Sequence, residues 1–156
     1  MRAYQVVEFG APLVSRTLPD PPLEARAVTV KVESCGLCHS DVHFYQGHIG
    51  LGGGQKLPVT TIGINTPATL GHEIYGRIAS FGPSSGLSPA DVGRPVVVYP
   101  WIGCGRCQAC LAGRDNECLH PENLGLQKPG GHGEKIVVRD AKFLINADGL
   151  IPLYAG

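Results

Sequence analysis

The sequence predicts a mainly β fold, an antiparallel barrel or sandwich of short strands. Glycine and proline account for 22 and 13 of the 156 residues, a share typical of strands joined by many turns. Short β-prone runs recur along the chain, and signals for helices are few. Hydrophobic residues make up 43% of the chain and charged residues 17%, which excludes a disordered protein.

The clearest strand signal lies between Ala27 and Glu33. Val28, Val30 and Val32 alternate there with polar residues, as in a strand with one buried face. Further β-prone runs, each bounded by Gly, Pro, Asp or Ser, lie at Ala3 to Glu8, Ile74 to Ser80, Pro95 to Tyr99, Lys135 to Val138 and Lys142 to Ile145. We therefore expect five or six short strands.

One short helix is predicted directly after Cys38. Ser40 followed by Asp41 has the form of an N-cap with an acidic first turn, and Gly47 stands where a left-handed residue would end the helix. Between Gly47 and Gly71 the chain is rich in glycine, and we expect an extended surface loop there.

Charge and hydropathy exclude several classes of partner. Lys plus Arg and Asp plus Glu each number 13, so no basic surplus is available to bind nucleic acid. No apolar window is long enough to span a bilayer, and the first residues lack the pattern of a signal peptide. We expect a cytoplasmic protein that contacts neither nucleic acid nor membrane.

Four cysteines form a compact C-x2-C-x2-C-x7-C pattern on a glycine-rich segment: Cys104, Cys107, Cys110 and Cys118. Four thiolates can surround one tetrahedral zinc ion and leave no position open for water or substrate, which indicates a structural site. Two disulfides are disfavoured because cysteines so close in sequence bridge poorly and a reducing compartment keeps thiols free. An iron–sulfur cluster remains an alternative, although the spacing matches neither ferredoxin pattern.

A second constellation combines Cys38 with His72 and Glu73. Catalytic zinc takes three protein ligands from Cys, His and carboxylate and keeps a fourth position for water or substrate. Each residue also has a plain structural interpretation, since a buried cysteine behaves as a small hydrophobe and a histidine beside glycine is often a turn residue. Cys35, on an extended segment, is interpreted as an inert core thiol.

Phosphate-binding and nucleophile motifs are absent from the sequence. It contains no G-x-G-x-x-G, no G-x-x-x-x-G-K and no G-x-S-x-G. The chain therefore binds no dinucleotide through a βαβ unit of its own.

Five motifs, in order, closely resemble those of the zinc-dependent alcohol dehydrogenases of the medium-chain dehydrogenase/reductase superfamily: CGLCHSDVH, TLGHEIYGRIASFG, DVGRPVVV, GCGRCQACLAGRDNEC and GGHGEKIVV. The resemblance implies a GroES-like, partly open β-barrel with short helices and a zinc-binding lobe at about 100–120. Residues 1–150 would be the catalytic domain. Residues 151–156, where Pro152 could begin a helix, would start the connection to a missing Rossmann domain that carries NAD or NADP.

The resemblance also assigns two zinc ions. Cys38 and His72 match the first two ligands of the catalytic zinc, and Glu73 matches a carboxylate beside it that can swing in as a ligand. Asp41 matches the acidic partner of the zinc-bound histidine. The four lobe cysteines match the structural zinc site. The third catalytic ligand, commonly Cys, is expected about where this chain ends, so either it follows the last residue or Tyr154 or Ala155 replaces it.

Three further residues match the parts of the family that handle substrate and cofactor. Ser40 matches the hydroxyl that touches the substrate oxygen, and His43 matches the histidine that ends a proton relay to solvent. His39 falls where the family often has a cation near the cofactor pyrophosphate.

The implied function is oxidation of alcohols to aldehydes or ketones by a longer, homo-oligomeric enzyme with NAD or NADP, the isolated chain being inactive. A zinc-stabilised GroES-like binding or assembly module without catalysis is the alternative, and the presence of Ser40 and His43 beside Cys38 and His72 argues against it. A nucleic-acid-binding zinc ribbon is disfavoured by the neutral charge and by an aromatic content of 6%.

Overall fold

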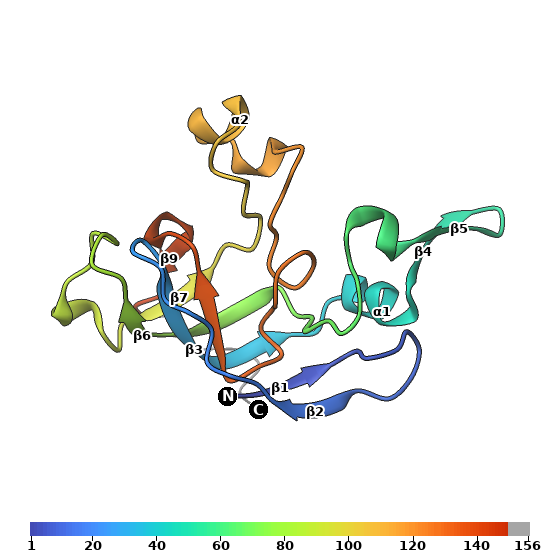
Figure 1. Ribbon diagram of the computed structural model, residues 1–156, viewed down its shortest axis with the longest axis horizontal. Helices are drawn as coiled ribbons and strands as arrows, with labels where there is room; N and C mark the ends of the chain where they lie inside the picture. Colours follow the sequence, from blue (N-terminus) through green and yellow to red (C-terminus); the bar gives the residue numbers. More distant parts are fainter. Residues whose placement is uncertain (150–156) are drawn as a thin grey trace.

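A five-stranded antiparallel sheet in the order β8-β3-β6-β7-β9 forms the centre of the computed structural model, which describes residues 1–149 (Figure 1). Its strands are β3 (Val28–Gly36), β6 (Glu73–Phe81), β7 (Pro95–Val98), β8 (Lys135–Val138) and β9 (Leu144–Asn146). Two hairpins flank it, one of β1 (Arg2–Gln5) with β2 (Val14–Thr17) and one of β4 (His48–Gly52) with β5 (Gln55–Pro58). The mainly β prediction is confirmed.

Helices are few and short. Within residues 1–149 the two α-helices are α1 (His39–Gln46) and α2 (Gln108–Leu111), and the 3-10 helices are η1 (Val59–Ile62), η2 (Pro89–Asp91), η3 (Asp115–Glu117) and η4 (Ala141–Phe143). None of these helices is long and apolar enough to cross a membrane. Figure 1 shows α2 and the chain around it projecting from the sheet as a separate lobe.

Alternation along the strands explains the core. Val28 and Val30 on β3 are fully buried and belong to one core cluster with Ile74 and Ile78 on β6. Val96 on β7 is part of the same cluster. A second apolar cluster lies beside α1 and consists of Val6, Phe44, Val59, Ile64, Ala68 and Leu70. Burying each such side chain stabilises the fold by roughly 1.5–3 kcal/mol.

The start of α1 differs from the sequence-based prediction. Cys38, and not Ser40, is the N-cap, and the helix begins at His39. The Asp41 carboxylate accepts a hydrogen bond from the Cys38 amide at 3.0 Å, so the acidic residue acts as the third helical residue of a capping box. Gly47 ends the helix with a φ of 78°, as expected.

The segment between Gly47 and Gly71 is not an extended loop. It contains the β4–β5 hairpin and η1, so the glycine-rich run is a turn between two strands. The run from Lys142 to Ile145, predicted as one strand, is divided between η4 and β9. The sequence did not predict the strand β2. Pro152, Tyr154 and Ala155 lie outside the described residues.

Candidate metal centres

The first centre lies where α1 meets the start of β6. The end of β3 delivers Cys38 to the N-terminus of α1, and the Cys38 thiol lies 3.1 Å from the Ser40 hydroxyl. His72 directly precedes β6 and is largely buried, with 11% of its side chain exposed. Two segments distant in sequence thus bring a thiol and an imidazole together.

Asp41 ties these segments to each other. One carboxylate oxygen accepts the Cys38 amide at 3.0 Å, and the other accepts the Gly71 amide at 3.0 Å and lies 3.6 Å from His72 Nδ1. Burial favours the neutral carboxyl, but the His72 ring and the two amides outweigh it and lower the pKa of Asp41. At 3.6 Å the contact with His72 is an ion pair and not a hydrogen bond, and the buried Nδ1 has no hydrogen-bond partner among the described residues. A carboxylate on the Nδ1 side of an imidazole is the arrangement that leaves Nε2 able to bind a metal.

The electrostatics of this pair favour a thiolate. The Ser40 hydroxyl and amide, followed by His72, lower the pKa of the Cys38 thiol. The Asp41 carboxylate, opposed by burial and assisted by Cys38, raises the pKa of His72 to about 9. Because metal ligands must be deprotonated, a cation that binds here takes the place of the imidazole proton.

Glu73 lies on the exposed side of β6. Its side chain covers Gly36, where an added Cβ would fall 2.1 Å from the Glu73 carboxylate. Within residues 1–149, Cys38, His72 and Glu73 do not form a group whose ligand atoms all lie within 4.8 Å of one another. The role of Glu73 as a ligand therefore stays a prediction.

Three residues of α1 stand beside this centre. Ser40 contacts the Cys38 thiol, as described above. His39 and His43, one turn apart, have ring centroids 4.6 Å from each other. The structure thus places all three predicted substrate and cofactor residues on the first turns of one helix.

The segment of residues 130–132 fixes the backbone before His72, a role that sequence reasoning missed. The amides of Gly130, Gly131 and His132 donate to the carbonyls of Thr69, Gly71 and Leu70 at 2.8 to 3.0 Å. These bonds join positions some 60 residues apart, so no local signal revealed them. The G-G-H run was the available hint, because an added Cβ on Gly130 would fall 2.2 Å from the Gly71 carbonyl oxygen.

Cys35 packs under this segment. The Cys35 sulfur would lie 2.7 Å from a Cβ added to either Gly71 or Gly131. Burial raises the pKa of this thiol to about 12, so it stays protonated. This supports the interpretation of Cys35 as an inert core thiol.

The second centre is the cysteine lobe. The sulfur atoms of Cys104, Cys107, Cys110 and Cys118 all lie within 4.8 Å of one another, and all six cysteines of the chain are free. The Cys107 sulfur is 3.4 Å from Cys110 and 3.8 Å from Cys118. Four sulfurs bound tetrahedrally at about 2.3 Å stand about 3.8 Å apart, so the cluster fits one zinc ion.

Backbone amides point at these sulfurs. The amides of Cys104 and His120 both donate to Cys118 Sγ at 3.3 Å. Amides of Arg106 and Cys107 lower the pKa of the Cys104 thiol to about 6. Such donors stabilise thiolates, the form that binds metal.

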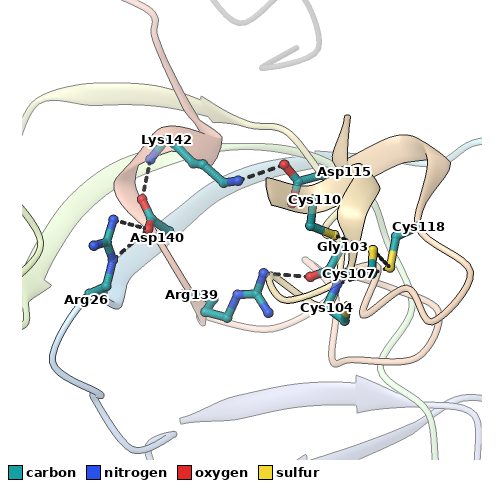
Figure 2. Close-up of polar contacts among 10 residues, drawn as sticks. All are labelled: Arg26, Gly103, Cys104, Cys107, Cys110, Asp115, Cys118, Arg139, Asp140 and Lys142. Atoms are coloured by element: carbon teal, nitrogen blue, oxygen red, sulfur yellow. Dashed lines mark hydrogen bonds and ion pairs between the residues drawn. The ribbon is translucent and has the colours of Figure 1, made fainter. Parts of the chain in front are cut away.

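Two cations from the end of β8 and from η4 hold this lobe against the sheet (Figure 2). Arg139 Nη2 donates to the Gly103 carbonyl at 2.6 Å, and Lys142 Nζ donates to Asp115 Oδ2 at 2.7 Å. The sequence distances are 36 and 27 residues, so the pattern of the chain could not reveal these contacts.

Comparison with known proteins identifies relatives over most of the chain. Residues 24–149 match the family model described as the alcohol dehydrogenase GroES-like domain. An NAD-dependent alcohol dehydrogenase of Sulfurisphaera tokodaii is 39% identical over 145 residues, which cover 92% of this chain and 40% of that protein. A sorbitol dehydrogenase of Bacillus subtilis is 40% identical over 103 residues, covering 65% of this chain and 26% of that one.

A solved structure shares the fold. The crystal structure of an NAD-dependent alcohol dehydrogenase superposes with a TM-score of 0.78 at 30% identity, covering 97% of this chain and 41% of the other. The GroES-like prediction is therefore confirmed. The chain spans about 40% of the length of the first of these relatives.

Proposed function

The chain belongs to the alcohol dehydrogenase GroES-like domain family, and from this premise we propose that it is the zinc- and alcohol-binding domain of an NAD(P)-dependent alcohol dehydrogenase. The observation that carries the proposal is the buried Asp41 carboxylate. It contacts the backbone of Cys38 on one side and the ring of His72 on the other. A desolvated charge is costly, and its position here serves to orient a metal-binding imidazole.

Cys38 and His72 are the ligands that we assign to a catalytic zinc. A zinc ion bound here would supply Lewis-acid polarisation of the alcohol oxygen. The chain's own contribution is to present a thiolate and an imidazole in a fixed relation. The amide of Cys38 and the amide of Gly71, which precedes His72, both donate to the Asp41 carboxylate. The third protein ligand is Glu73 or a residue beyond position 149.

Ser40 and His43 are the residues that we assign to proton transfer. They are three positions apart on α1 and so share one face of the helix. The Ser40 hydroxyl would accept the alcohol proton, and His43, half-buried, would pass it to solvent, since imidazole exchanges protons near neutral pH. The exposed His39 would lie beside the pyrophosphate of NAD or NADP.

The cysteine lobe would hold a second, structural zinc ion. Four protein ligands leave no open position, so this ion takes no part in the reaction and fixes the lobe. Hydride acceptance belongs to a cofactor domain outside this chain, and we propose that the longer protein is a cytoplasmic homo-oligomer. Relatives named for alcohols and for sorbitol leave its substrate at the level of small alcohols.

The test uses the longer protein that contains this domain. His72→Ala should abolish alcohol oxidation while leaving the circular dichroism spectrum unchanged, because the core of the sheet does not depend on this ring. His48→Ala, which changes another partly exposed histidine, is the matched control and should keep parental turnover. Retention of near-parental activity by His72→Ala would overturn the catalytic assignment.

A non-catalytic assembly module makes the opposite prediction for the same pair of variants. Such a module requires the lobe but has no need for Asp41 to be buried against His72. Absence of alcohol oxidation in the longer parent protein, with lobe metal retained both in the parent and in His72→Ala, would therefore favour it.

A further inference from the structure

His39 and His43 form a close pair of imidazoles at the start of α1. They are four positions apart, the spacing at which two side chains stand one above the other on a helix. Their ring centroids are 4.6 Å apart, and the ring planes are tilted by 33°. His39 is exposed and His43 half-buried, so the pair can be reached from solvent.

The separation of the rings matches that of a metal chelate. Two imidazoles bound at about 2.0–2.1 Å to one tetrahedral ion bring their centroids about 5 Å apart. The observed 4.6 Å needs a shift of only a few tenths of an ångström. The same i, i+4 spacing presents both zinc-binding histidines in helical H-E-x-x-H sites.

The ring nitrogens of this pair are free to bind. Among the hydrogen bonds within residues 1–149, none engages a ring nitrogen of His39 or His43. In contrast, His48 Nδ1 lies 3.1 Å from the Gln46 carbonyl oxygen. Two neighbouring imidazoles whose nitrogens make no hydrogen bond among the described residues are suited to bind one cation.

We propose that His39 and His43 together bind a divalent transition-metal ion, at a site additional to the two zinc sites of the proposed function. Imidazole ligands suit Zn²⁺, Ni²⁺ and Cu²⁺. The pair supplies two protein ligands where the lobe supplies four, so water completes the coordination and the affinity is lower than at the cysteines. An ion held there occupies the lone pair of His43.

This occupation has a functional consequence, which rests on the proposed function. If His43 carries the alcohol proton to solvent, a metal ion on its ring blocks that step, and excess Zn²⁺ inhibits the longer enzyme. The metal site itself depends only on the geometry of α1, so binding and inhibition can be measured separately.

The experiment uses this chain without an affinity tag, first saturated with Zn²⁺ and freed of excess. Isothermal titration with Ni²⁺ should show one further equivalent. Replacing residues that merely orient a ligand typically costs 10–100-fold in metal affinity, so loss of a direct ligand in His39→Asn or His43→Asn should cost at least about tenfold. The matched control His48→Asn should bind like the parent.

A second measurement keeps the proposal testable should a variant unfold. In the parent chain, ring-resolved NMR during addition of excess Zn²⁺ should shift the signals of His39 and His43 together and leave His48 unmoved. Equal Ni²⁺ affinities in all four proteins, or no further equivalent in the parent, would overturn the proposal. So would Zn²⁺-induced shifts confined to His72.

Discussion

Lys142 Nζ lies 2.7 Å from Asp115 Oδ2, and this contact joins the cysteine lobe to the sheet (Figure 2). The Asp115 side chain is 8% exposed and that of Lys142 46%. Asp115 begins η3, which leads directly to Cys118. The lysine also lies 4.7 Å from the centroid of the Phe143 ring. One cation therefore neutralises a buried carboxylate that lies three residues before Cys118, in the lobe that carries the four clustered cysteines.

We expect Lys142→Met to weaken the lobe. It leaves Asp115 buried without its cation, at a cost of about 1–3 kcal/mol, and the uncompensated charge repels the thiolates. Metal release to a chelator should be faster than in the parent, and the Tm should fall. Lys128→Met, at an exposed lysine 3.9 Å from Glu122, is the control and should change the Tm little.

The double variant Asp115→Asn/Lys142→Met decides the cause. It removes the buried charge together with its partner, so most of the lost metal retention should return. A double variant as damaged as Lys142→Met would show that packing of the lysine on Phe143, and not charge compensation, holds the lobe.

Cys104→Ser should remove about one equivalent of zinc from the purified chain or make it labile to chelators. The reason is that a serine hydroxyl replaces a thiolate stabilised by the amides of Arg106 and Cys107. Elemental analysis after gel filtration measures the loss. The matched control is Cys35→Ser, which changes a thiol outside the cluster and should keep the lobe zinc. Equal zinc content in Cys104→Ser and the parent would contradict the assignment.

The contact between Arg26 and Asp140 predicts a dependence of stability on pH. Burial opposes the charge of Asp140, but the Lys142 amide and the Arg26 guanidinium 2.7 Å away outweigh it and lower the pKa of this carboxyl. A carboxyl whose pKa is lower in the folded state stabilises the fold above its unfolded pKa of about 3.9. That contribution is lost as the pH falls through the folded pKa.

Asp140→Asn isolates this effect. The amide oxygen can still cap η4 by accepting the Lys142 amide, but the charge is gone. The variant should be less stable than the parent at pH 7, by no more than about 1 kcal/mol because Arg26 is exposed. The difference in Tm should shrink as the pH falls below about 3.9 and vanish once the pH lies below the folded pKa of Asp140. A difference that does not shrink with falling pH would point to a damaged cap instead.

The predictability of the two centres from sequence differs for a physical reason. The lobe cysteines lie within 15 residues of one another, so their spacing alone indicated a metal site. The contacts that orient them, from Arg139 and Lys142, cross the fold and leave no local pattern. At the other centre, Cys38 and His72 are 34 positions apart, so residue types alone suggested the pair with a plain structural alternative, and the family resemblance added the match to zinc ligands.

Local errors also have identifiable causes. The predicted cap at Ser40 was wrong because Cys38 precedes the helix in extended conformation and Asp41 caps its amide by the side chain. The β4–β5 hairpin was missed because its turn is made of glycines in the left-handed region, which resemble a flexible loop in sequence. β2 has no buried residue, so it lacks the alternation that reveals a strand.

Gly71→Ala should destabilise the chain more than a glycine substitution of similar backbone geometry elsewhere. Gly71 has a φ of +93°, and an added Cβ would fall 2.7 Å from both Cys35 Sγ and His132 Cδ2. The strained backbone costs about 1–2 kcal/mol and the crowding a further 1–3 kcal/mol. Gly52→Ala, at a φ of +86° with nothing within 4 Å, should show the backbone cost alone. Urea unfolding measures the stability loss of both variants, and equal losses would contradict the close packing around Gly71.

The Gly71 amide donates to the Asp41 carboxylate at 3.0 Å. Because Gly71→Ala displaces this amide, the variant should also weaken metal binding by Cys38 and His72 while sparing the lobe.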